Sequence, residues 1–274
     1  MHHPAESRIT IVTVSLNNRT GLEKTIRSVI SQRKISVEYI VIDGGSEDGS
    51  LEIIKKHGLN IAAWISEPDQ GPYYAMNKGI GLATGEWINF LNAGDVFLGS
   101  DSLSGIIQQL RHDGIDAIYG DSLADYVDFK VYRKARPFEE LWKGMIFSHQ
   151  ALLMRASLLK EERFDTRYPK IADYDMILRC MRDPARVRYI PVPLVICDAF
   201  GISNKGQAFI LREYYRRARK SLRMDFVRKL YYIKMSVFLS IVDLIKMMLP
   251  ERLFIVMIRL FRKNILSQKK IGQG

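Results

Sequence analysis

The chain contains little cysteine and lacks the signatures of several common enzyme classes. Only Cys180 and Cys197 occur among its 274 residues, and they do not stand at metal-ligand spacing. A disulfide framework or a cysteine zinc site is therefore excluded as the basis of the fold, and we interpret both as reduced thiols of a cytosolic protein. Gly-x-Ser-x-Gly, P-loop and Gly-x-Gly-x-x-Gly sequences are also missing. Their absence argues against α/β-hydrolases, P-loop nucleotidases and dinucleotide-binding oxidoreductases.

The sequence also lacks a long apolar run that is free of charge. A membrane-spanning helix needs about 20 such residues, and the strongest candidate, residues 230–249, is interrupted by Lys234, Asp243 and Lys246. Residues 1–8 are polar and show none of the apolar character of a secretion signal. We therefore expect a polar N-terminal tail and a cytoplasmic location.

Acidic residues are scarce only in the last quarter of the chain. Residues 205–274 hold 17 Lys and Arg against 4 Asp and Glu, whereas residues 1–204 hold 24 against 26. Apolar and basic residues alternate there as in amphipathic helices that lie on an anionic membrane, with a last helix expected to begin at Pro250. We predict a 1–8 tail, a main domain over 9–204 and a basic amphipathic helical module over 205–274. A helical cap on the main domain, a dimer contact and, with less support, nucleic-acid binding are the alternatives for this module.

Strand and helix patterns alternate over the first 120 residues. Short β-branched or apolar runs predict strands at 9–15, 37–42, 61–65, 87–91 and 117–120. Apolar residues at helical spacing predict helices after Thr20, which we expect to be an N-cap, and at 51–57, 73–83 and 103–110. This alternation is typical of βαβ units. Strand patterns at 127–133 and 151–154 lack regular crossover helices, so the fold class is α/β with a mixed sheet whose second half is more antiparallel.

Acidic residues follow the carboxyl ends of successive predicted strands. Asp43 ends the second, Asp69 follows the third, Asp95 the fourth and Asp121 the fifth. Open α/β sheets bind ligands at this edge, whereas like charges held close together cost stability. A divalent cation, Mg²⁺ or Mn²⁺, shared with a diphosphate would relieve the repulsion, because such ions prefer oxygen ligands. Taken alone, Asp95 could equally cap a turn, as Asp after Gly commonly does.

Three of these acids, Asp43, Asp69 and Asp95, lie within a set of four ordered segments at consistent spacing. The segments are Ile42-Asp43-Gly44-Gly45-Ser46-x-Asp48-Gly49-Ser50, Ser66-Glu67-Pro68-Asp69-Gln70-Gly71, Ala75-Met76-Asn77-Lys78-Gly79 and Phe90-Leu91-Asn92-Ala93-Gly94-Asp95. Together they resemble family 2 glycosyltransferases with the GT-A fold, above all bacterial enzymes of capsule, exopolysaccharide and O-antigen assembly such as colanic acid glycosyltransferases. The resemblance extends from about Ile9 to Ser203, so it implies that 9–204 is a GT-A catalytic domain.

The resemblance implies a donor-binding role for several residues. Asp43 would hydrogen-bond the base of a nucleotide-diphospho-sugar, and Ser15 would line the same pocket. Asp69 would lie beside the nucleotide and the sugar. Asn77 and Lys78 would support that wall of the site.

The resemblance also implies a metal contact, and here the sequence departs from the family pattern. Asp95 would be the metal-contacting member of an Asp-x-Asp-type motif, but Asn92 and Gly94 stand where further acids are common. One carboxylate would then hold the cation, and its binding would depend on the diphosphate. Tyr74 stands where many relatives have Asp, which bears on the sugar that is accepted.

A general base is implied near the acceptor. Asp173 corresponds to the Asp of the family's Glu-Asp motif, although Ala172 stands where relatives often have Glu. From the residues alone Asp173 could be an N-cap and Asp175 a first-turn charge, and we interpret Asp175 as structural. His149 resembles an acceptor-side residue, although a lone His is often structural. Gly201 resembles part of the loop that closes over the diphosphate, with an ordinary turn as the alternative.

Two classes of function follow from the sequence. The first is an inverting enzyme that moves one sugar per acceptor, because the Gln-x-x-Arg-Trp motif of processive synthases is absent. It would act on a glycan or polyprenyl-diphosphate-linked acceptor for surface polysaccharide, as a peripheral protein on the inner face of the bacterial plasma membrane. A homo-oligomer stays open and nucleic acid is not an expected partner. The second is a non-catalytic nucleotide-sugar-binding or membrane scaffold protein on the same fold.

Overall fold

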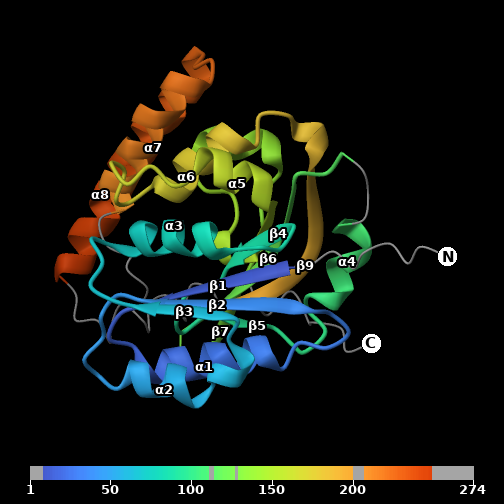
Figure 1. Cartoon of the computed structure of the whole chain (residues 1–274). Helices are drawn as coiled ribbons and strands as arrows, with labels where there is room; N and C mark the ends of the chain where they lie inside the picture. Colours follow the sequence, from blue (N-terminus) through green and yellow to red (C-terminus); the bar gives the residue numbers. More distant parts are fainter. Residues whose placement is uncertain (1–8, 111–113, 127–128, 200–206, 249–274) are drawn as a thin grey trace.

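A mixed sheet runs through the middle of the molecule, with helices on both of its faces (Figure 1). The computed structural model describes residues 9–110, 114–126, 129–199 and 207–248. The strands are β1 (Ile9–Ser15), β2 (Val37–Asp43), β3 (Ala63–Ser66), β4 (Trp87–Phe90), β5 (Val96–Phe97), β6 (Ala117–Asp125), β7 (Lys130–Arg133), β8 (Leu152–Arg155) and β9 (Val187–Asp198). The helices are α1 (Arg19–Ile30), α2 (Ser50–Lys56), α3 (Pro72–Leu82), α4 (Ser104–Leu110), α5 (Ala156–Glu162), α6 (Ala172–Cys180), α7 (Gln207–Ser221) and α8 (Phe226–Met248). Two 3₁₀ segments matter below, η2 (Phe138–Lys143) and η3 (His149–Ala151).

The strand order is β3-β2-β1-β4-β8-β6-β9-β5, and β7 pairs with β6. Strand β1 runs parallel to both β2 and β4, and β2 runs parallel to β3. Strand β8 is antiparallel to β4 and β6, and β5 is antiparallel to β9. The predicted mixed sheet with a more antiparallel second half is therefore confirmed. The parallel half also places the carboxyl ends of β1 to β4 at one edge of the sheet.

Every residue of β1 is buried, as expected for a central strand covered by helices on both faces. Helices α1 and α2 cover one face of the sheet, where apolar side chains such as Leu22 and Ile54 are buried. Helices α3, α5, α6 and α7 cover the opposite face. Helix α3 comes unusually close to β1 because it presents Gly79 there. A Cβ atom on Gly79 would lie 2.3 Å from Cγ1 of Val12, so the sequence permits this approach only without a side chain.

Two predictions from the sequence about where elements begin or end are wrong. Thr20 is not the N-cap of α1. Asn18 is, and its Oδ1 accepts a hydrogen bond from the amide of Gly21 at 3.1 Å. Asp121 does not end its strand, because β6 continues to Asp125 by pairing with β7 and β9.

Asp121 therefore belongs to the interior of the sheet rather than to its acidic edge. Its side chain is buried and accepts hydrogen bonds from the hydroxyls of Tyr132 and Tyr189, the latter at 2.8 Å, and from the amide of Ala135 at 2.7 Å. These donors satisfy the carboxylate within the fold. The sheet edge therefore carries one acidic residue fewer than the sequence predicted.

Helices α7 and α8 lie together beside α6 at one end of the molecule (Figure 1). Ile210 and Ala218 of α7 are buried in the largest hydrophobic core, so α7 shares that core with the predicted catalytic domain. The division at residue 204 remains a prediction. No helix among the described residues is long and apolar enough to cross a membrane. The 1–8 tail and the helix predicted from Pro250 lie outside the described residues.

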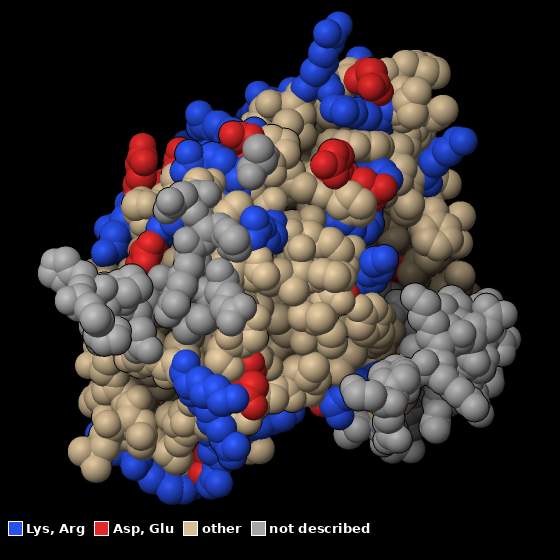
Figure 2. Space-filling model, turned by 90° about the vertical axis from the view of Figure 1, so that its right-hand side faces the viewer, with Lys and Arg blue, Asp and Glu red and all other residues tan. Residues whose placement is uncertain are grey.

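Charged side chains are unevenly distributed over the surface. The face shown in Figure 2 has a largely uncharged middle, with Lys and Arg, and fewer Asp and Glu, around its margin. The net charge of +11 is thus not spread as one continuous basic surface on this face.

Candidate active site

The loop after β4 lies beside the carboxyl end of β1. The amide of Ala93 donates to the carbonyl of Val14 at 3.0 Å, and Nδ2 of Asn18 donates to the carbonyl of Ala93 at 3.0 Å. Gly94 has a φ of +105°, a conformation that side chains with a Cβ rarely adopt. The loop is therefore held between β1 and the start of α1, and it turns so that Asp95 points back into the molecule.

Asp95 is buried and is held by two hydrogen bonds. Its Oδ1 accepts from the amide of Asp198 at 2.9 Å, and its Oδ2 accepts from Nε2 of Gln150 at 2.8 Å. Burial raises the pKa of Asp95 above its ordinary value, since removing a carboxylate from water disfavours its charged form. Each oxygen retains a free lone pair, so the group could still accept a cation.

His149 connects Asp173 to the loop after β4. Its Nδ1 lies 3.4 Å from Oδ2 of Asp173, and its Nε2 lies 3.2 Å from Nδ2 of Asn92. His149 and Gln150 are adjacent residues of η3. One short turn therefore contacts both Asp173 and Asp95, and the structure brings together the predicted base, the predicted acceptor-side residue and the predicted metal contact.

Asp173 is the second residue of α6, and the N-cap position belongs to Ile171. The alternative that Asp173 is an N-cap is therefore wrong, although it does lie in the first turn. Its side chain is 14% exposed, so solvent or a substrate can reach it. The aromatic ring of Tyr73 lies nearby: burial, and after it the Asp173 carboxylate, raise the pKa of Tyr73 well above its ordinary value. Tyr73 therefore stays protonated beside Asp173.

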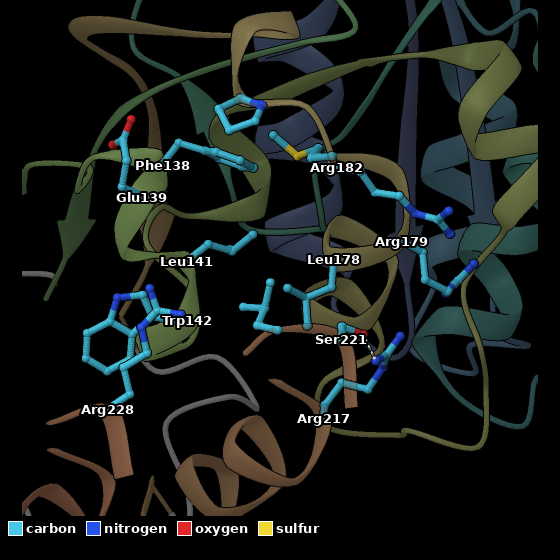
Figure 3. Close-up of a pocket in the computed structure, with 13 residues that line it drawn as sticks. Phe138, Glu139, Leu141, Trp142, Leu178, Arg179, Arg182, Arg217, Ser221 and Arg228 are labelled. Atoms are coloured by element: carbon cyan, nitrogen blue, oxygen red, sulfur yellow. Dashed lines mark hydrogen bonds between the residues drawn. The ribbon is translucent and has the colours of Figure 1, made fainter. Parts of the chain in front are cut away.

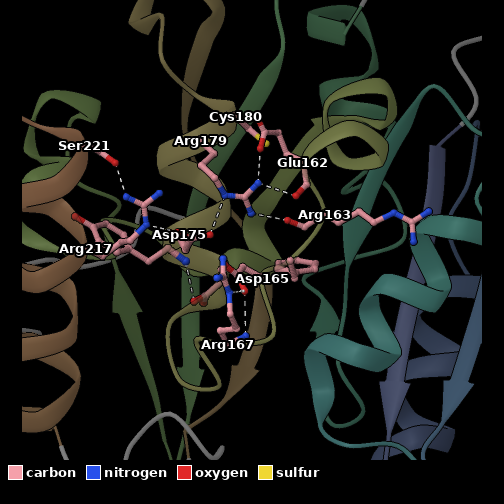
Figure 4. A network of polar contacts seen from close by, with 12 residues as sticks. Glu162, Arg163, Asp165, Arg167, Asp175, Arg179, Cys180, Arg217 and Ser221 are labelled. Carbon is pink, nitrogen blue, oxygen red and sulfur yellow. Dashed lines mark hydrogen bonds and ion pairs between the residues drawn. The ribbon is translucent and has the colours of Figure 1, made fainter.

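Asp175, by contrast, has the contacts of a structural residue. It is 1% exposed and forms ion pairs with Arg179, at 2.8 Å, and with Arg217 of α7 (Figure 4). Its interpretation from the sequence agrees with these contacts. The pair with Arg217 joins α7 to the helix that carries Asp173.

The first part of the sheet edge is formed by the ends of β1 and β2. Ser15 and Asp43 are register partners there. Asp43 is fully buried and accepts hydrogen bonds from the amide of Ser46 at 2.9 Å and from the hydroxyl of Ser66 at 2.7 Å. Its present contacts shape the loop after β2. The hydroxyl oxygen of Ser15 is buried and has no hydrogen-bond partner among the described residues, an arrangement that a bound ligand would satisfy.

Asp69 and Lys78 form an ion pair across the next part of the edge. Lys78 also contacts Glu67 at 2.6 Å, and the hydrogen bonds to Asp69 and Glu67 raise the pKa of Lys78. Oδ2 of Asp69 is buried without a partner in the described part of the chain. Asn77 uses both ends of its amide on the backbone of Phe164, at 2.9 Å each, which suits a supporting role. Gly201 lies outside the described residues.

Three contacting residues were not singled out by sequence reasoning. Gln150 holds Asp95, Asn18 holds the loop after β4, and Tyr73 lies beside Asp173. Gln150 stands next to His149 in a segment that was recognised, so its polar side chain was a usable signal. Nothing in the sequence connects Tyr73 to a residue so distant in the chain.

Comparison with known proteins decides the family. The model of the family described as Glycosyl transferase family 2 matches residues 10–183. The chain belongs to this family. As a glycosyltransferase it is an enzyme, which favours the first of the two functional classes over a scaffold protein. The matched residues include Asp43, Asp69, Asp95, His149 and Asp173.

Mycobacterial glycosyltransferases are among its relatives. A "PGL/p-HBAD biosynthesis glycosyltransferase" of Mycobacterium tuberculosis is 30% identical over 227 residues, covering 80% of this chain and 87% of the relative. An "uncharacterized glycosyltransferase" of the same species is 33% identical over 190 residues, covering 66% of this chain and 72% of the relative. The colanic acid glycosyltransferases, which the sequence motifs resemble, are therefore one example from a wider family.

Solved structures show that the fold is GT-A. S. aureus TarS 1–349 in complex with UDP has a TM-score of 0.63 at 13% identity, covering 84% of this chain and 70% of that one. A mannosyltransferase from Pyrobaculum calidifontis in complex with GDP-Man and Mn²⁺ has a TM-score of 0.60 at 18% identity, covering 79% and 65%. Glucosyl-3-phosphoglycerate synthase from M. tuberculosis with Mn²⁺, UDP and glucosyl-3-phosphoglycerate has a TM-score of 0.55 at 15% identity, covering 81% and 82%. The predicted fold class is therefore confirmed.

Proposed function

We propose that this glycosyltransferase moves one sugar, with inversion, from a nucleotide-diphospho-sugar to a hydroxyl of a glycan or lipid-linked acceptor. The observation that supports it most is the contact of η3 with both Asp95 and Asp173. A donor at the sheet edge and an acceptor near Asp173 would meet at this turn. Solved proteins of the same fold that bind UDP, UDP-GlcNAc or GDP-Man support the choice of donor class.

Asp173 is the proposed general base. Inversion is a single displacement: the acceptor oxygen attacks the anomeric carbon while the bond from that carbon to the diphosphate oxygen breaks and the nucleoside diphosphate leaves. The acceptor hydroxyl loses its proton in this step, and a carboxylate within reach can take it. His149 and the amide of Tyr174, which donates to Oδ1 of Asp173 at 2.8 Å, would hold the carboxylate in one orientation. Tyr73, protonated and adjacent, would help to exclude water from it.

The residues at the sheet edge fit a divalent cation shared with a diphosphate, but not a site built by the protein alone. Among the described residues no group of three or more His, Cys, Asp or Glu is placed to hold a metal ion. Asp95 is a buried carboxylate whose pKa is raised chiefly by burial, so an added positive charge would stabilise its ionised form. Asp95 would hold the Mg²⁺ or Mn²⁺. When bound, the ion would neutralise charge on the departing nucleoside diphosphate.

On the donor side, Ser15 and Asp69 each offer a buried oxygen without a partner in the described part of the chain. Nucleotide hydroxyls or base N–H groups would satisfy them. Asp43 would exchange its serine contacts for the base, and Lys78 and Asn77 would keep α3 and its neighbours in place. Sugar and base identity do not follow from these contacts.

Membrane association and a surface-polysaccharide role belong to the same proposal. Helix α8 exposes large apolar side chains along its length, such as Phe226, Ile233, Phe238 and Ile241, each at least 53% exposed. Basic residues, Lys229 and Lys234 among them, are interspersed, as in helices that lie in a bilayer interface. This supports a peripheral membrane contact through α8, and we propose the cytoplasmic face of a bacterial plasma membrane as its place.

Two substitutions test the transferase mechanism. Asp173→Asn is expected to abolish transfer while calorimetry still detects UDP or GDP binding, because only the proton acceptor is lost. Asp95→Asn is expected to abolish transfer and to remove the Mn²⁺ dependence of nucleotide binding. Asp101→Asn, at an exposed carboxylate, is the control and should retain activity. Normal turnover by the Asp173 variant would refute its role as base, and normal turnover by the Asp95 variant would refute its role as metal contact.

Flotation with anionic liposomes tests the membrane contact. The full chain should float, and a chain ending at residue 224, which keeps α7 but lacks α8, should not. Equal flotation of both would refute the role of α8, and a dimer in solution that dissociates on the same truncation would favour the alternative of a dimer contact.

A further inference from the structure

A pocket lies at the carboxyl end of α6, whereas Asp173 lies near its amino end (Figure 3). Its volume is about 740 Å³, which is in the range of small-molecule sites. It is bounded by η2, the carboxyl end of α6 with the residues that follow, the carboxyl end of α7 and the start of α8. Asp173 lies in the first turn of α6, and the next residue, Tyr174, packs its ring against Tyr214 of α7, with ring centres 4.6 Å apart and the planes tilted by 60°. None of the proposed transfer residues lines this pocket.

Guanidinium groups dominate the charged lining of this pocket. Four arginines and one carboxylate line it: Arg179, Arg182, Arg217, Arg228 and Glu139. Two of the arginines, Arg179 and Arg217, are committed to the buried Asp175. The other two have no carboxylate at hydrogen-bond distance among the described residues. Their nearest ones lie 3.7 Å from Arg182 and 3.8 Å from Arg228.

Arg182 and Arg228 lie on opposite sides of the pocket (Figure 3), and each can therefore contact a bound anion without breaking a buried pair. Arg182 is 75% exposed, and Arg228 donates one hydrogen bond to the carbonyl of Arg223 at 2.8 Å, which leaves its other N–H groups available. Planar guanidinium groups bind phosphate oxygens through paired hydrogen bonds. The charge of the pocket suits a phosphate group.

The remaining walls of the pocket are apolar. Leu141, Leu178, Met181 and Leu222 line it together with the rings of Phe138 and Trp142. The guanidinium of Arg228 lies over the Trp142 ring, 5.4 Å from its centre. A bare inorganic anion would leave these walls without a partner, so the lining fits a molecule that joins a phosphate to an apolar part.

The start of α8 borders the pocket and also exposes apolar side chains to solvent. Trp142 packs edge-on against Tyr231 of α8, with ring centres 5.1 Å apart. Phe226 and Val227, in the first turn of α8 beside Arg228, are 78% and 71% exposed. A lipid whose headgroup entered the pocket could therefore lay its chains along α8.

We propose that this pocket binds the phosphate headgroup of an anionic lipid, at a site separate from the sugar-transfer site. The inference rests on the membrane contact proposed above for α8, and not on the transfer chemistry. Arg182 and Arg228 supply the charge, Trp142 and its apolar neighbours receive the glycerol and the first carbons of the chains, and α8 lies on the membrane surface.

Trp142 provides a direct probe of the pocket in the full chain. Titration with a short-chain phosphatidic acid below its micelle concentration should change the tryptophan fluorescence and saturate. A phosphatidylcholine of the same chain length, which adds a bulky cation, should bind at least about tenfold more weakly. Inorganic phosphate should also bind at least about tenfold more weakly, because it makes no apolar contact.

Matched double variants test the residues. Arg182→Ala with Arg228→Ala should weaken phosphatidic acid binding at least about tenfold, since two charged donors are lost. The control, Arg216→Ala with Arg219→Ala, removes the same charge from α7 outside the pocket and should change binding less than about twofold. Thermal melts of both variants establish that they fold. In Trp142→Phe the fluorescence change should disappear while calorimetry still detects the lipid.

Several results would overturn the proposal. They are equal weakening by the pocket and control pairs, a persistent signal in Trp142→Phe, and inorganic phosphate binding as tightly as the lipid. The first indicates a diffuse basic surface, the second a different site, and the third a site for free phosphate. UDP and GDP binding, measured on the same proteins, should be unchanged, so loss of lipid binding is distinguished from failure of the donor-site assignment.

Discussion

Replacement of Arg217 by methionine is expected to destabilise the whole catalytic domain. The substitution keeps most of the apolar stem and removes the guanidinium that pairs with Asp175. Both partners are buried, with side-chain exposures of 10% for Arg217 and 2% for Asp175, so solvent screens the pair little. Removing one partner of a buried ion pair costs about 3–5 kcal/mol. Because Arg179 still faces Asp175 (Figure 4), we expect about 2–3 kcal/mol.

That loss should be visible as a fall in the melting temperature. A domain of this size loses about 2–4 °C per kcal/mol, so the midpoint should fall by roughly 4–12 °C. The control is Arg216→Met in the same helix, whose ion pair with Glu213 is 62% exposed on the arginine side and should contribute less than about 1 kcal/mol. Urea unfolding of both variants, together with Asp175→Asn and the double variant, measures the coupling of the pair. Equal stability of the Arg217 and Arg216 variants would refute the argument that α7 is an integral part of the core.

Three further predictions concern the core, the sheet edge and the thiols. Gly79→Ala should destabilise the chain by about 1–3 kcal/mol through overpacking against β1, whereas Gly81→Ala, two residues along α3 with open space around it, should stabilise it by up to about 1 kcal/mol. The pKa of Asp95 is raised in the folded chain. Without metal, the buried carboxylate therefore lowers the free energy of unfolding at pH values above the pKa that Asp95 has in the unfolded chain. This destabilisation diminishes as the pH falls. Asp95→Asn should therefore raise the metal-free melting temperature at pH 7 and flatten its dependence on pH between 4 and 7, and an unchanged profile would contradict this. Burial raises the pKa of the Cys180 thiol to about 12 and that of Cys197 further, so alkylation at pH 8 should label both only after unfolding, as mass spectrometry can show.

Local pattern was sufficient for the regular half of the fold. Strand β1 occupies the predicted residues 9–15 because its β-branched run is buried on both sides. The predicted helix at 73–83 and the observed α3 (Pro72–Leu82) differ by one residue at each end. In both cases a strong periodic pattern and flanking turn residues are sufficient to predict the element.

Elements that depend on distant partners were not predicted. Strand β9 contains two prolines and little alternation, and it forms because it pairs with the long β6 through a bulge. The same pairing extends β6 past Asp121 and removes that acid from the edge. Strand β5 is two residues long and exists only as a partner of β9. Sequence periodicity carries no information about such pairing.

The candidate site shows the same division. The edge acids Asp43, Asp69 and Asp95 follow from strand ends and from family resemblance, since both depend on local sequence. The contacts that orient them do not. Gln150 contacts Asp95 and His149 contacts Asp173 because β8, which follows them in the chain, lies between β4 and β6 in the sheet. Likewise the charge pattern that assigns α7 to a basic module does not reveal the ion pair of Arg217 with Asp175.

The adjacency of His149 and Gln150 in η3 links the two ends of the site mechanically. Neighbouring Cα atoms are about 3.8 Å apart, so a shift of this turn displaces both side chains together, and with them the partners Asp173 and Asp95. A bound molecule that moves this turn at the Asp173 end would therefore also change the position of Gln150 against Asp95. Insertion of a single residue between the two would uncouple the carboxylates while leaving every strand of the sheet intact.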